Sequence, residues 1–189
     1  DEAESVATIH KALDLGINFL DTADMYGSGS NEVLLGKTVR ERRGQVVLAT
    51  KFGNVRDGNG RFIGVNGRPE YVRAACENSL RRLGMQVIDL YYQHRVDPEV
   101  AIEETVGAMA DLVRQGKVLY IGISDAPAWW IAQANTLASL RGWSPFVGLQ
   151  IEYSLVERTV ERELISMAKA LNLGVTAWSP LSNGVLTGK

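Results

Sequence analysis

Residues 44–51 read GQVVLATK, a glycine followed by an apolar run that closes on a lysine. The same order recurs along the chain, after stretches whose apolar residues are spaced as on one face of a helix. Glycine is favoured just past a helix end, where the backbone often needs a positive φ. Most of the runs lack polar alternation, which is typical of parallel strands buried on both faces. The predicted strands span residues 17–21, 46–51, 87–93, 118–124, 146–151 and 175–179.

The alternation of helical and strand patterns predicts an α/β fold with a parallel sheet and right-handed crossovers. Two architectures share this pattern, a doubly wound open sheet and a (β/α)8 TIM barrel. An open nucleotide-binding sheet should carry G-x-G-x-x-G in its first strand–helix turn. The nearest stretch, residues 27–32 (GSGSNE), lacks the third glycine. In a barrel, functional side chains come from the C-terminal ends of many strands. Polar residues close the runs in that way, at Asp21, Lys51, His94, Ser124, Gln150 and Ser179.

The sequence therefore favours the barrel, in one domain over residues 1–189. A chain of 189 residues is long enough for one substantial core and short for two domains. A closed barrel of this class needs about eight strands. Because six runs are visible, we expect an incomplete portion of a (β/α)8 barrel with about six parallel strands. Residues 53–68, rich in Gly and Asn, are expected to form a loop that bulges from the rim.

The composition argues against several classes of partner. The 22 acidic and 20 basic residues nearly cancel, which gives no hint of nucleic acid or of a membrane surface. No apolar run approaches the roughly 20 residues of a membrane helix. The single cysteine, Cys76, excludes an internal disulfide and fits a reducing compartment. We therefore expect a cytoplasmic protein.

Lys51 and Asp21 are charged residues at the ends of buried strands. Lys51 has an ordinary alternative as a lysine that keeps its head in solvent, and Asp21 as a cap of the next helix. Both alternatives weaken if the two strands are neighbours, because each charge then supplies the counter-ion of the other.

Tyr26 and His94 also have ordinary alternatives. A loop tyrosine usually serves packing, and its phenol, with a pKa near 10, is a poor proton donor at neutral pH. We expect the ammonium of Lys51 to lower that pKa. A single histidine is more often structural than catalytic. His94 closes a strand, whereas the only other histidine, His10, lies on a predicted helix and is expected to be exposed.

At this point the motifs match a known family. Residues 16–26 (GINFLDTADMY), followed by Asn31-Glu32-x-x-Leu35-Gly36, closely resemble the first aldo-keto reductase signature. Residues 49–53 (ATKFG) resemble the lysine strand of that family, and residues 89–94 (DLYYQH) resemble its histidine strand. The resemblance runs from the first helix to the last residue, and the motifs occur in order at the spacing of the family.

The resemblance implies reduction of an aldehyde or ketone to an alcohol, with hydride from NADPH and a proton from Tyr26. Lys51, held by Asp21, would tune Tyr26, and His94 would orient the carbonyl oxygen. Preorganised charge of this kind is expected to carry much of the rate. The implied partner is a small-molecule carbonyl compound. The family segment that grips the 2′-phosphate follows the last strand and has no counterpart in the sequence, which leaves NADH open.

The resemblance also assigns the cofactor-binding residues. Ser124 and Gln150 match positions that hydrogen-bond the nicotinamide carboxamide, and Trp178 matches the ring that stacks on the nicotinamide. Ser179 and Leu181 match positions near the pyrophosphate. Asp125 stands where many members have Asn, and an ionised Asp only accepts hydrogen bonds. It could therefore hold the carboxamide NH2 group but not its oxygen.

Other readings of the sequence remain open. A non-catalytic, nicotinamide-binding regulatory subunit of the same fold would keep similar motifs. A metal-dependent barrel hydrolase would need a cluster of His and carboxylate ligands, and two histidines argue against it. The pair Trp129-Trp130 suggests either an interface or, as is more common for aromatic pairs on an amphipathic helix, half-buried core.

Overall fold

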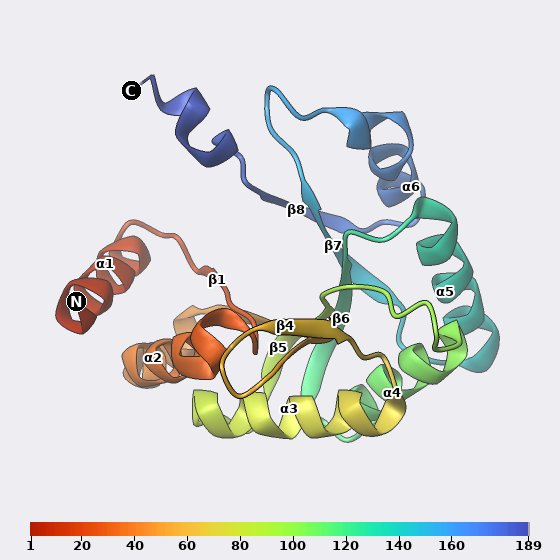
Figure 1. The fold of residues 1–189 in the computed structure, drawn as a ribbon, viewed down its shortest axis with the longest axis horizontal. Coiled ribbons are helices and arrows are strands. Elements are labelled where there is room, and N and C mark those ends of the chain that lie inside the picture. Colours follow the sequence, from red (N-terminus) through yellow and green to blue (C-terminus); the bar gives the residue numbers. More distant parts are fainter. Residues whose placement is uncertain (189) are drawn as a thin grey trace.

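The computed structural model describes residues 1–188 and contains a parallel sheet that curls into part of a barrel (Figure 1). Within these residues the sheet has six strands in the order β1-β2-β5-β6-β7-β8. Their bounds are Phe19–Asp21 (β1), Val47–Phe52 (β2), Ile88–Gln93 (β5), Val118–Ser124 (β6), Phe146–Glu152 (β7) and Gly174–Trp178 (β8). All adjacent pairs are parallel. The prediction of an incomplete (β/α)8 barrel with about six parallel strands is confirmed.

Helices follow the strands and cover the outer, convex side of the curled sheet (Figure 1). The α-helices are Glu2–Asp14 (α1), Ser30–Val39 (α2), Pro69–Leu83 (α3), Ile102–Arg114 (α4), Ala128–Arg141 (α5) and Leu164–Ala170 (α6). Short 3₁₀ turns span Tyr26–Gly29 (η1), Arg40–Gln45 (η2), Thr159–Arg162 (η3) and Ser182–Thr187 (η4). Gly84 ends α3 with a φ of 65°, as predicted. After α6 the positive φ falls on Asn172 and Gly174 begins β8, so the predicted helix-ending role of Gly174 is wrong.

The buried core has an outer and an inner part. The larger cluster lies between the sheet and the helices, whereas Ala49, Leu90 and Tyr92 form a separate buried cluster. Tyr92 needs space that its neighbours leave. A Cβ atom on Gly122 would lie 2.5 Å from the Tyr92 ring, and one on Gly148 would lie 2.9 Å from the Tyr92 hydroxyl. The two glycines of β6 and β7 therefore make room for one aromatic ring of β5.

Residues 53–68 are not the predicted irregular loop. Asn54–Arg56 (β3) and Phe62–Val65 (β4) pair as an antiparallel hairpin. The Asp57 carboxylate accepts hydrogen bonds from the backbone N–H groups of Asn59 and Arg61, each at 2.9 Å. Asp commonly caps turns in this way, and Gly and Asn are frequent in hairpin turns as well as in loops. The composition that suggested a loop is thus the composition of a hairpin turn.

The exposure of His10 and of the pair Trp129-Trp130 tests two further expectations. His10 is half-buried, with its Nε2 atom 3.1 Å from the Thr38 carbonyl oxygen, so the expected exposure is wrong. Trp130 is 5% exposed and packs against Phe146, whereas Trp129 is 63% exposed. Half of the tryptophan pair therefore belongs to the core. Within residues 1–188, no helix has both the length and the apolar character that crossing a membrane requires.

Candidate active site

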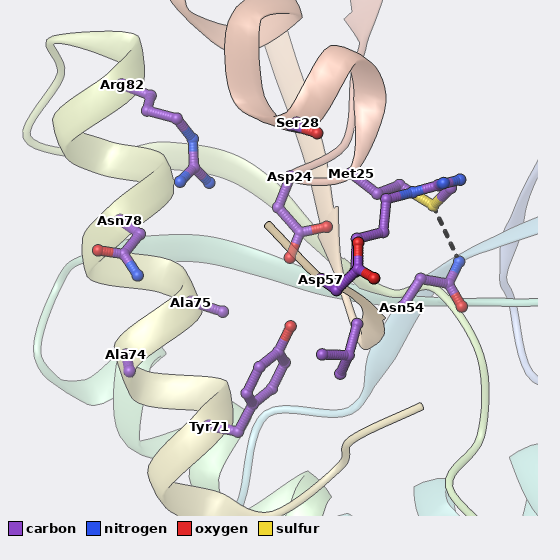
Figure 2. A pocket seen from close by; sticks show the side chains of 12 residues that line it. Asp24, Met25, Ser28, Asn54, Asp57, Tyr71, Ala74, Ala75, Asn78 and Arg82 are labelled. Carbon is purple, nitrogen blue, oxygen red and sulfur yellow. Dashed lines mark hydrogen bonds between the residues drawn. The ribbon is translucent and has the colours of Figure 1, made fainter. Parts of the chain in front are cut away.

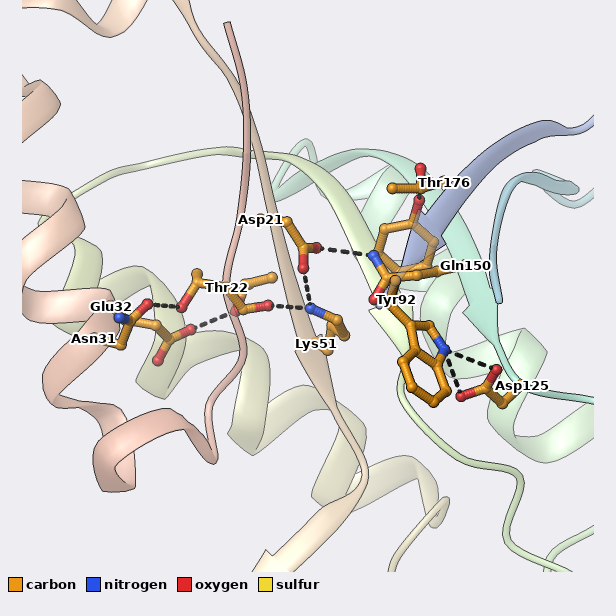
Figure 3. Close-up of polar contacts among 11 residues, drawn as sticks. Asp21, Thr22, Asn31, Glu32, Lys51, Tyr92, Asp125, Gln150 and Thr176 are labelled. Atoms are coloured by element: carbon orange, nitrogen blue, oxygen red, sulfur yellow. Dashed lines mark hydrogen bonds and ion pairs between the residues drawn. The ribbon is translucent and has the colours of Figure 1, made fainter. Parts of the chain in front are cut away.

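The strands β1 and β2 bring Asp21 and Lys51 into direct contact (Figure 3). The Lys51 ammonium lies 2.5 Å from the Asp21 carboxylate and donates to the Thr22 carbonyl oxygen at 2.7 Å. The Lys51 side chain is 0% exposed, which excludes a head group in solvent. The Asp21 carboxylate also accepts a bond from the Gln150 amide at 3.2 Å, so its contacts are with site residues rather than with a helix end. The predicted counter-ion pair is confirmed.

Tyr26 and His94 lie beside this pair. The Lys51 ammonium is 5.0 Å from the centroid of the Tyr26 ring. The rings of Tyr26 and His94 meet edge to face, with centroids 6.1 Å apart and an interplanar angle of 85°. Backbone bonds hold His94 and the segment before Tyr26 to β2, because His94 N–H donates to the Phe52 carbonyl and Asp24 N–H donates to that of Lys51. Asp21, Tyr26, Lys51 and His94 thus converge at one end of the sheet.

Burial sets the charge of these groups. It lowers the pKa of Lys51, while the adjacent Asp21 carboxylate partly offsets the effect. His94 is buried, and burial, with the charges of Lys51 and Arg95, lowers its pKa to about 3. The imidazole is therefore neutral at physiological pH. Among the described residues its Nδ1 atom has no hydrogen-bond partner.

Tyr26 departs from expectation. Its pKa is raised, first by burial and then by the negative charge of Asp21, while Arg95 lowers it. The expectation that Lys51 lowers the pKa of Tyr26 is therefore wrong for this arrangement. The Asp21 carboxylate lies 2.5 Å from Lys51, and its negative charge opposes the effect of the ammonium on the Tyr26 phenol.

Two of the predicted cofactor-binding residues lie at neighbouring strand ends. Ser124 ends β6 and pairs in register with Gln150 of β7, and both side chains are buried. Gln150 reaches across the end of the sheet to Asp21. Ser124 and Gln150 are thus close to the cluster of ionisable residues, as predicted from the strand ends.

Asp125 is already engaged by protein groups. Its carboxylate forms an ion pair with Arg95. It also accepts from the Trp178 indole N–H at 3.0 and 3.1 Å, the two bonds drawn at Asp125 in Figure 3. A backbone φ of 44° at Asp125 accompanies these contacts. Sequence reasoning missed Arg95, although its position directly after His94 was a signal. A role of Asp125 toward a carboxamide stays a prediction.

Ser179 and Leu181 lie beyond β8, in the segment that leads into η4. Ser179 has a φ of 53°, and its carbonyl accepts from the Ser182 N–H at 2.9 Å. Leu181 is 54% exposed. No side-chain hydrogen bond within residues 1–188 links either residue to the Asp21–Lys51 pair. Their predicted position near a pyrophosphate is neither supported nor excluded by these contacts.

A cavity of about 450 Å³ lies beneath the hairpin, between η1 and α3 (Figure 2). Asp24, Tyr71, Asn78 and Arg82 line it. Burial and the charge of Glu32 raise the pKa of Asp24 to about 7, and its Oδ1 atom has no hydrogen-bond partner among the described residues. This carboxyl group stands two residues before Tyr26, within residues 16–26, and the sequence motifs assigned it no role. Residues 1–188 contain no group of His, Cys, Asp and Glu that could hold a metal ion.

Comparison with known proteins places the chain in a family. The model of the Aldo/keto reductase family matches residues 1–189. The chain belongs to the aldo-keto reductase family. It is 43% identical to "Probable aldo-keto reductase 1" of Glycine max over 191 aligned positions, covering 100% of this chain and 53% of the relative. It thus spans about half the length of that aldo-keto reductase.

A solved aldo-keto reductase has the same fold. The holo form of aldo-keto reductase AKR11C1 from Bacillus halodurans superposes with a TM-score of 0.87 at 32% identity. The match covers 100% of this chain and 61% of that protein. The resemblance inferred from the motifs is therefore confirmed, both as a family and as a fold.

Proposed function

We propose that the protein is an NADPH-dependent oxidoreductase that reduces an aldehyde or ketone to an alcohol. The observation that carries the proposal is the ion pair of the buried Lys51 with Asp21, which lies beside the contact between Tyr26 and His94. A buried lysine needs a partner, and here the partner and the neighbouring phenol form one compact group. Membership of the aldo-keto reductase family supports the same reaction class.

Each residue of the group has a role in moving one proton. The bound nicotinamide would supply hydride to the carbonyl carbon. The Tyr26 hydroxyl would donate its proton to the oxygen, so that the C=O double bond becomes a C–O single bond while one C–H and one O–H bond form. The positive charge of Lys51 stabilises the phenolate that Tyr26 becomes, and Asp21 holds the ammonium in place. Because neutral His94 carries one N–H, it can donate to the carbonyl oxygen and orient it.

Because the pKa of Tyr26 is raised, the phenol is protonated at neutral pH and has a proton to give. A donor of this kind gives up its proton only when negative charge forms on the substrate oxygen. The field of Arg95, which lowers the pKa of Tyr26, acts in the direction that favours this transfer.

The residues on the other side of the strand ends suit a nicotinamide. Gln150 and Ser124 offer an amide and a hydroxyl that can donate to and accept from a carboxamide, and both are buried. Trp178 offers a half-buried ring beside them. Asp125 would have to exchange its contact with Arg95 or Trp178 for one with the carboxamide. We assign Ser179 and Leu181 to the pyrophosphate end, with NADPH as cofactor and NADH as the alternative.

The remaining assignments belong to the same proposal. The partner is a small-molecule carbonyl compound, with neither nucleic acid nor membrane, and the location is the cytoplasm. The near balance of 22 acidic and 20 basic residues and the unpaired, buried Cys76 support these assignments. Residues 1–189 would form a single partial barrel domain.

The test is oxidation of NADPH by the full-length protein with a panel of aldehydes and ketones. Tyr26→Phe should lower kcat by about 100- to 10,000-fold, because it removes the proton donor, and should leave the Kd of NADPH nearly unchanged. Tyr120→Phe is the matched control, since Tyr120 is an exposed residue of β6. A Tyr26→Phe variant as active as the parent would show that Tyr26 is not the donor. NADPH binding without turnover in the parent would favour the non-catalytic subunit.

A further inference from the structure

Glu32, in the first turn of α2, is a charged residue with no exposure to solvent. Its Oε1 atom accepts from the Thr50 hydroxyl of β2 at 2.6 Å, and its Oε2 atom accepts from the Arg82 guanidinium of α3 at 2.5 Å. One carboxylate therefore joins three elements of the fold. Burial of an ion pair is costly and seldom adds stability relative to apolar packing, whereas it fixes geometry well. The contacts of Glu32 thus point to a role in positioning.

The contact with Thr50 lies directly behind Lys51. Successive side chains of a strand point to opposite faces, so Thr50 faces the helices when Lys51 faces the barrel interior. The register agrees, because Thr50 pairs with Tyr91, whose hydroxyl reaches the backbone of α3. Glu32 therefore holds β2 from the outside at the residue before Lys51, while Asp21 holds Lys51 from the inside.

Asn31, the residue before Glu32, binds Thr22, the second residue that contacts the Lys51 ammonium (Figure 3). The Thr22 hydroxyl donates to the Asn31 side-chain oxygen at 2.7 Å, and the Thr22 carbonyl accepts from the Lys51 ammonium at 2.7 Å. Two consecutive residues of α2 thus fix both the strand that carries Lys51 and the carbonyl that binds its ammonium.

The segment between these supports carries Tyr26. It runs from Thr22 to Asn31 through the turn η1, where Gly29 has a φ of 93°. A Cβ atom on Gly29 would lie 2.5 Å from the Cδ atom of Arg82, so the Arg82 side chain packs directly under the turn. The Glu32–Arg82 pair therefore fixes the base of the turn as well as its C-terminal end.

We infer that Glu32, locked by Arg82 and Thr50, is a positioning residue that sets the placement of Lys51 relative to Tyr26. The inference rests on the proposed function, since it assigns a role within the same group of residues. Glu32 contacts neither Tyr26 nor Lys51 through its side-chain hydrogen bonds, and it acts through Thr50, Asn31 and the turn. Loss of its charge should displace the ammonium and the phenol relative to each other.

The chain offers a matched control for this role. Asp89 also joins β2 to an arginine, because its Oδ2 atom lies 2.7 Å from the Arg43 guanidinium and accepts from the Leu48 N–H at 2.7 Å. Asp89 acts at the other end of β2, away from Lys51. Glu32→Gln and Asp89→Asn each replace a carboxylate by an amide in a similar setting. If the loss of any carboxylate–arginine contact at β2 lowered activity, both variants would lose kcat to the same extent.

The experiment compares the two variants in the full-length protein. Glu32→Gln should lower kcat by about 10- to 100-fold with little change in the KM of NADPH, because a small displacement of reacting groups is costly. It should also raise the pKa of Tyr26, followed by NMR of ring-labelled tyrosine and assigned with Tyr26→Phe. Asp89→Asn should lower the Tm without either effect. Equal losses of kcat in both variants, or a parental Tyr26 titration in Glu32→Gln, would overturn the inference.

A milder variant covers the case in which Glu32→Gln does not fold. Thr50→Val removes one hydroxyl donor from Glu32 and keeps the shape of the side chain. It should shift the Tyr26 titration in the same direction by a smaller amount, and an unshifted titration would count against the inference. The NMR titration does not depend on turnover. If Tyr26→Phe were fully active, the proposed function would fail while the titration still decided the role of Glu32.

Discussion

The residues at the C-terminal ends of the strands fall into two groups that differ in their contacts. On the side of β1, β2 and β5, the Tyr26 ring lies beside both the Lys51 ammonium and the His94 ring, and buried Lys51 is paired with Asp21. On the side of β6 to β8, Asp125 binds Arg95 and Trp178, which are not its predicted partners. The residues that we propose to move the proton are thus brought together by the chain itself. The residues assigned to the cofactor keep contacts that a bound cofactor would have to replace.

The largest expected effect is a loss of kcat on substitution of Lys51, which lies at the centre of the first group. Lys51→Met should lower kcat by about 100- to 10,000-fold, because it removes the charge that stabilises the phenolate, while NADPH binding stays nearly unchanged. Steady-state kinetics and a fluorescence titration of NADPH measure the two quantities. Lys117→Met, which removes an ion pair with Glu77 on the outer surface, is the control. If Lys51→Met weakened NADPH binding as strongly as it lowered kcat, the residues proposed for proton transfer would not be functionally separate from those assigned to the cofactor.

A smaller effect, on the free energy of unfolding, is expected at Asp24, two residues before Tyr26. The folded protein holds this proton up to about pH 7, whereas an exposed carboxyl releases it near 3.8. The folded state therefore binds more protons between these values, and the free energy of unfolding falls as the pH rises from about 4 to about 7.

Asp24→Asn should remove this dependence. At pH 8 the variant should be more stable than the parent by about 4 kcal/mol, and at pH 4 the two should be similar. Urea unfolding at several pH values provides the measurement. Asp57→Asn, on the hairpin side of the same cavity, is the control for a general change of charge. A parent whose stability rises from pH 4 to pH 7 through Asp24 would contradict the raised pKa.

The smallest effect is expected on the other side, at Asp125. Asp125→Asn removes the ion pair with Arg95 and adds a side-chain donor for the carboxamide oxygen. NADPH should therefore bind more tightly by about tenfold or less, since an exposed ion pair contributes little by itself. Titration of tryptophan fluorescence gives the Kd, with Asp111→Asn as a control at an exposed ion pair. Weaker binding would mean that the carboxylate matters through its hold on Trp178.

Much of the fold could be predicted because the central strands β2, β5, β6 and β7 are mostly buried on both faces. A continuous apolar run such as residues 46–51 has few alternatives, and β2 was placed within one residue at each end. The hairpin at residues 53–68 was missed because its strands are short and half-exposed, so that they lack an apolar run. Gly and Asn in its turn suggested a loop.

The candidate site was predictable only in part. The strand ends placed Asp21, Lys51 and His94 together, because parallel strands deliver their C-terminal residues to one edge. The partners of Glu32 were not visible, since Arg82 is 50 positions away and lies on a different helix. The pKa of Tyr26 was predicted in the wrong direction because a sequence shows neither the burial of the phenol nor the nearby Asp21 carboxylate, which both raise that pKa.

The complete burial of Lys51 has a practical consequence for labelling experiments. Amine-reactive reagents attack a neutral, accessible amine, and the Lys51 side chain is 0% exposed and paired with Asp21. Lys11, Lys37 and Lys169 lie at the surface and should react within the first moments. Acylation of Lys51 should instead wait for β1 and β2 to separate. The rate at which label appears on the peptide that contains Lys51, measured by mass spectrometry, would therefore report how often β1 and β2 separate.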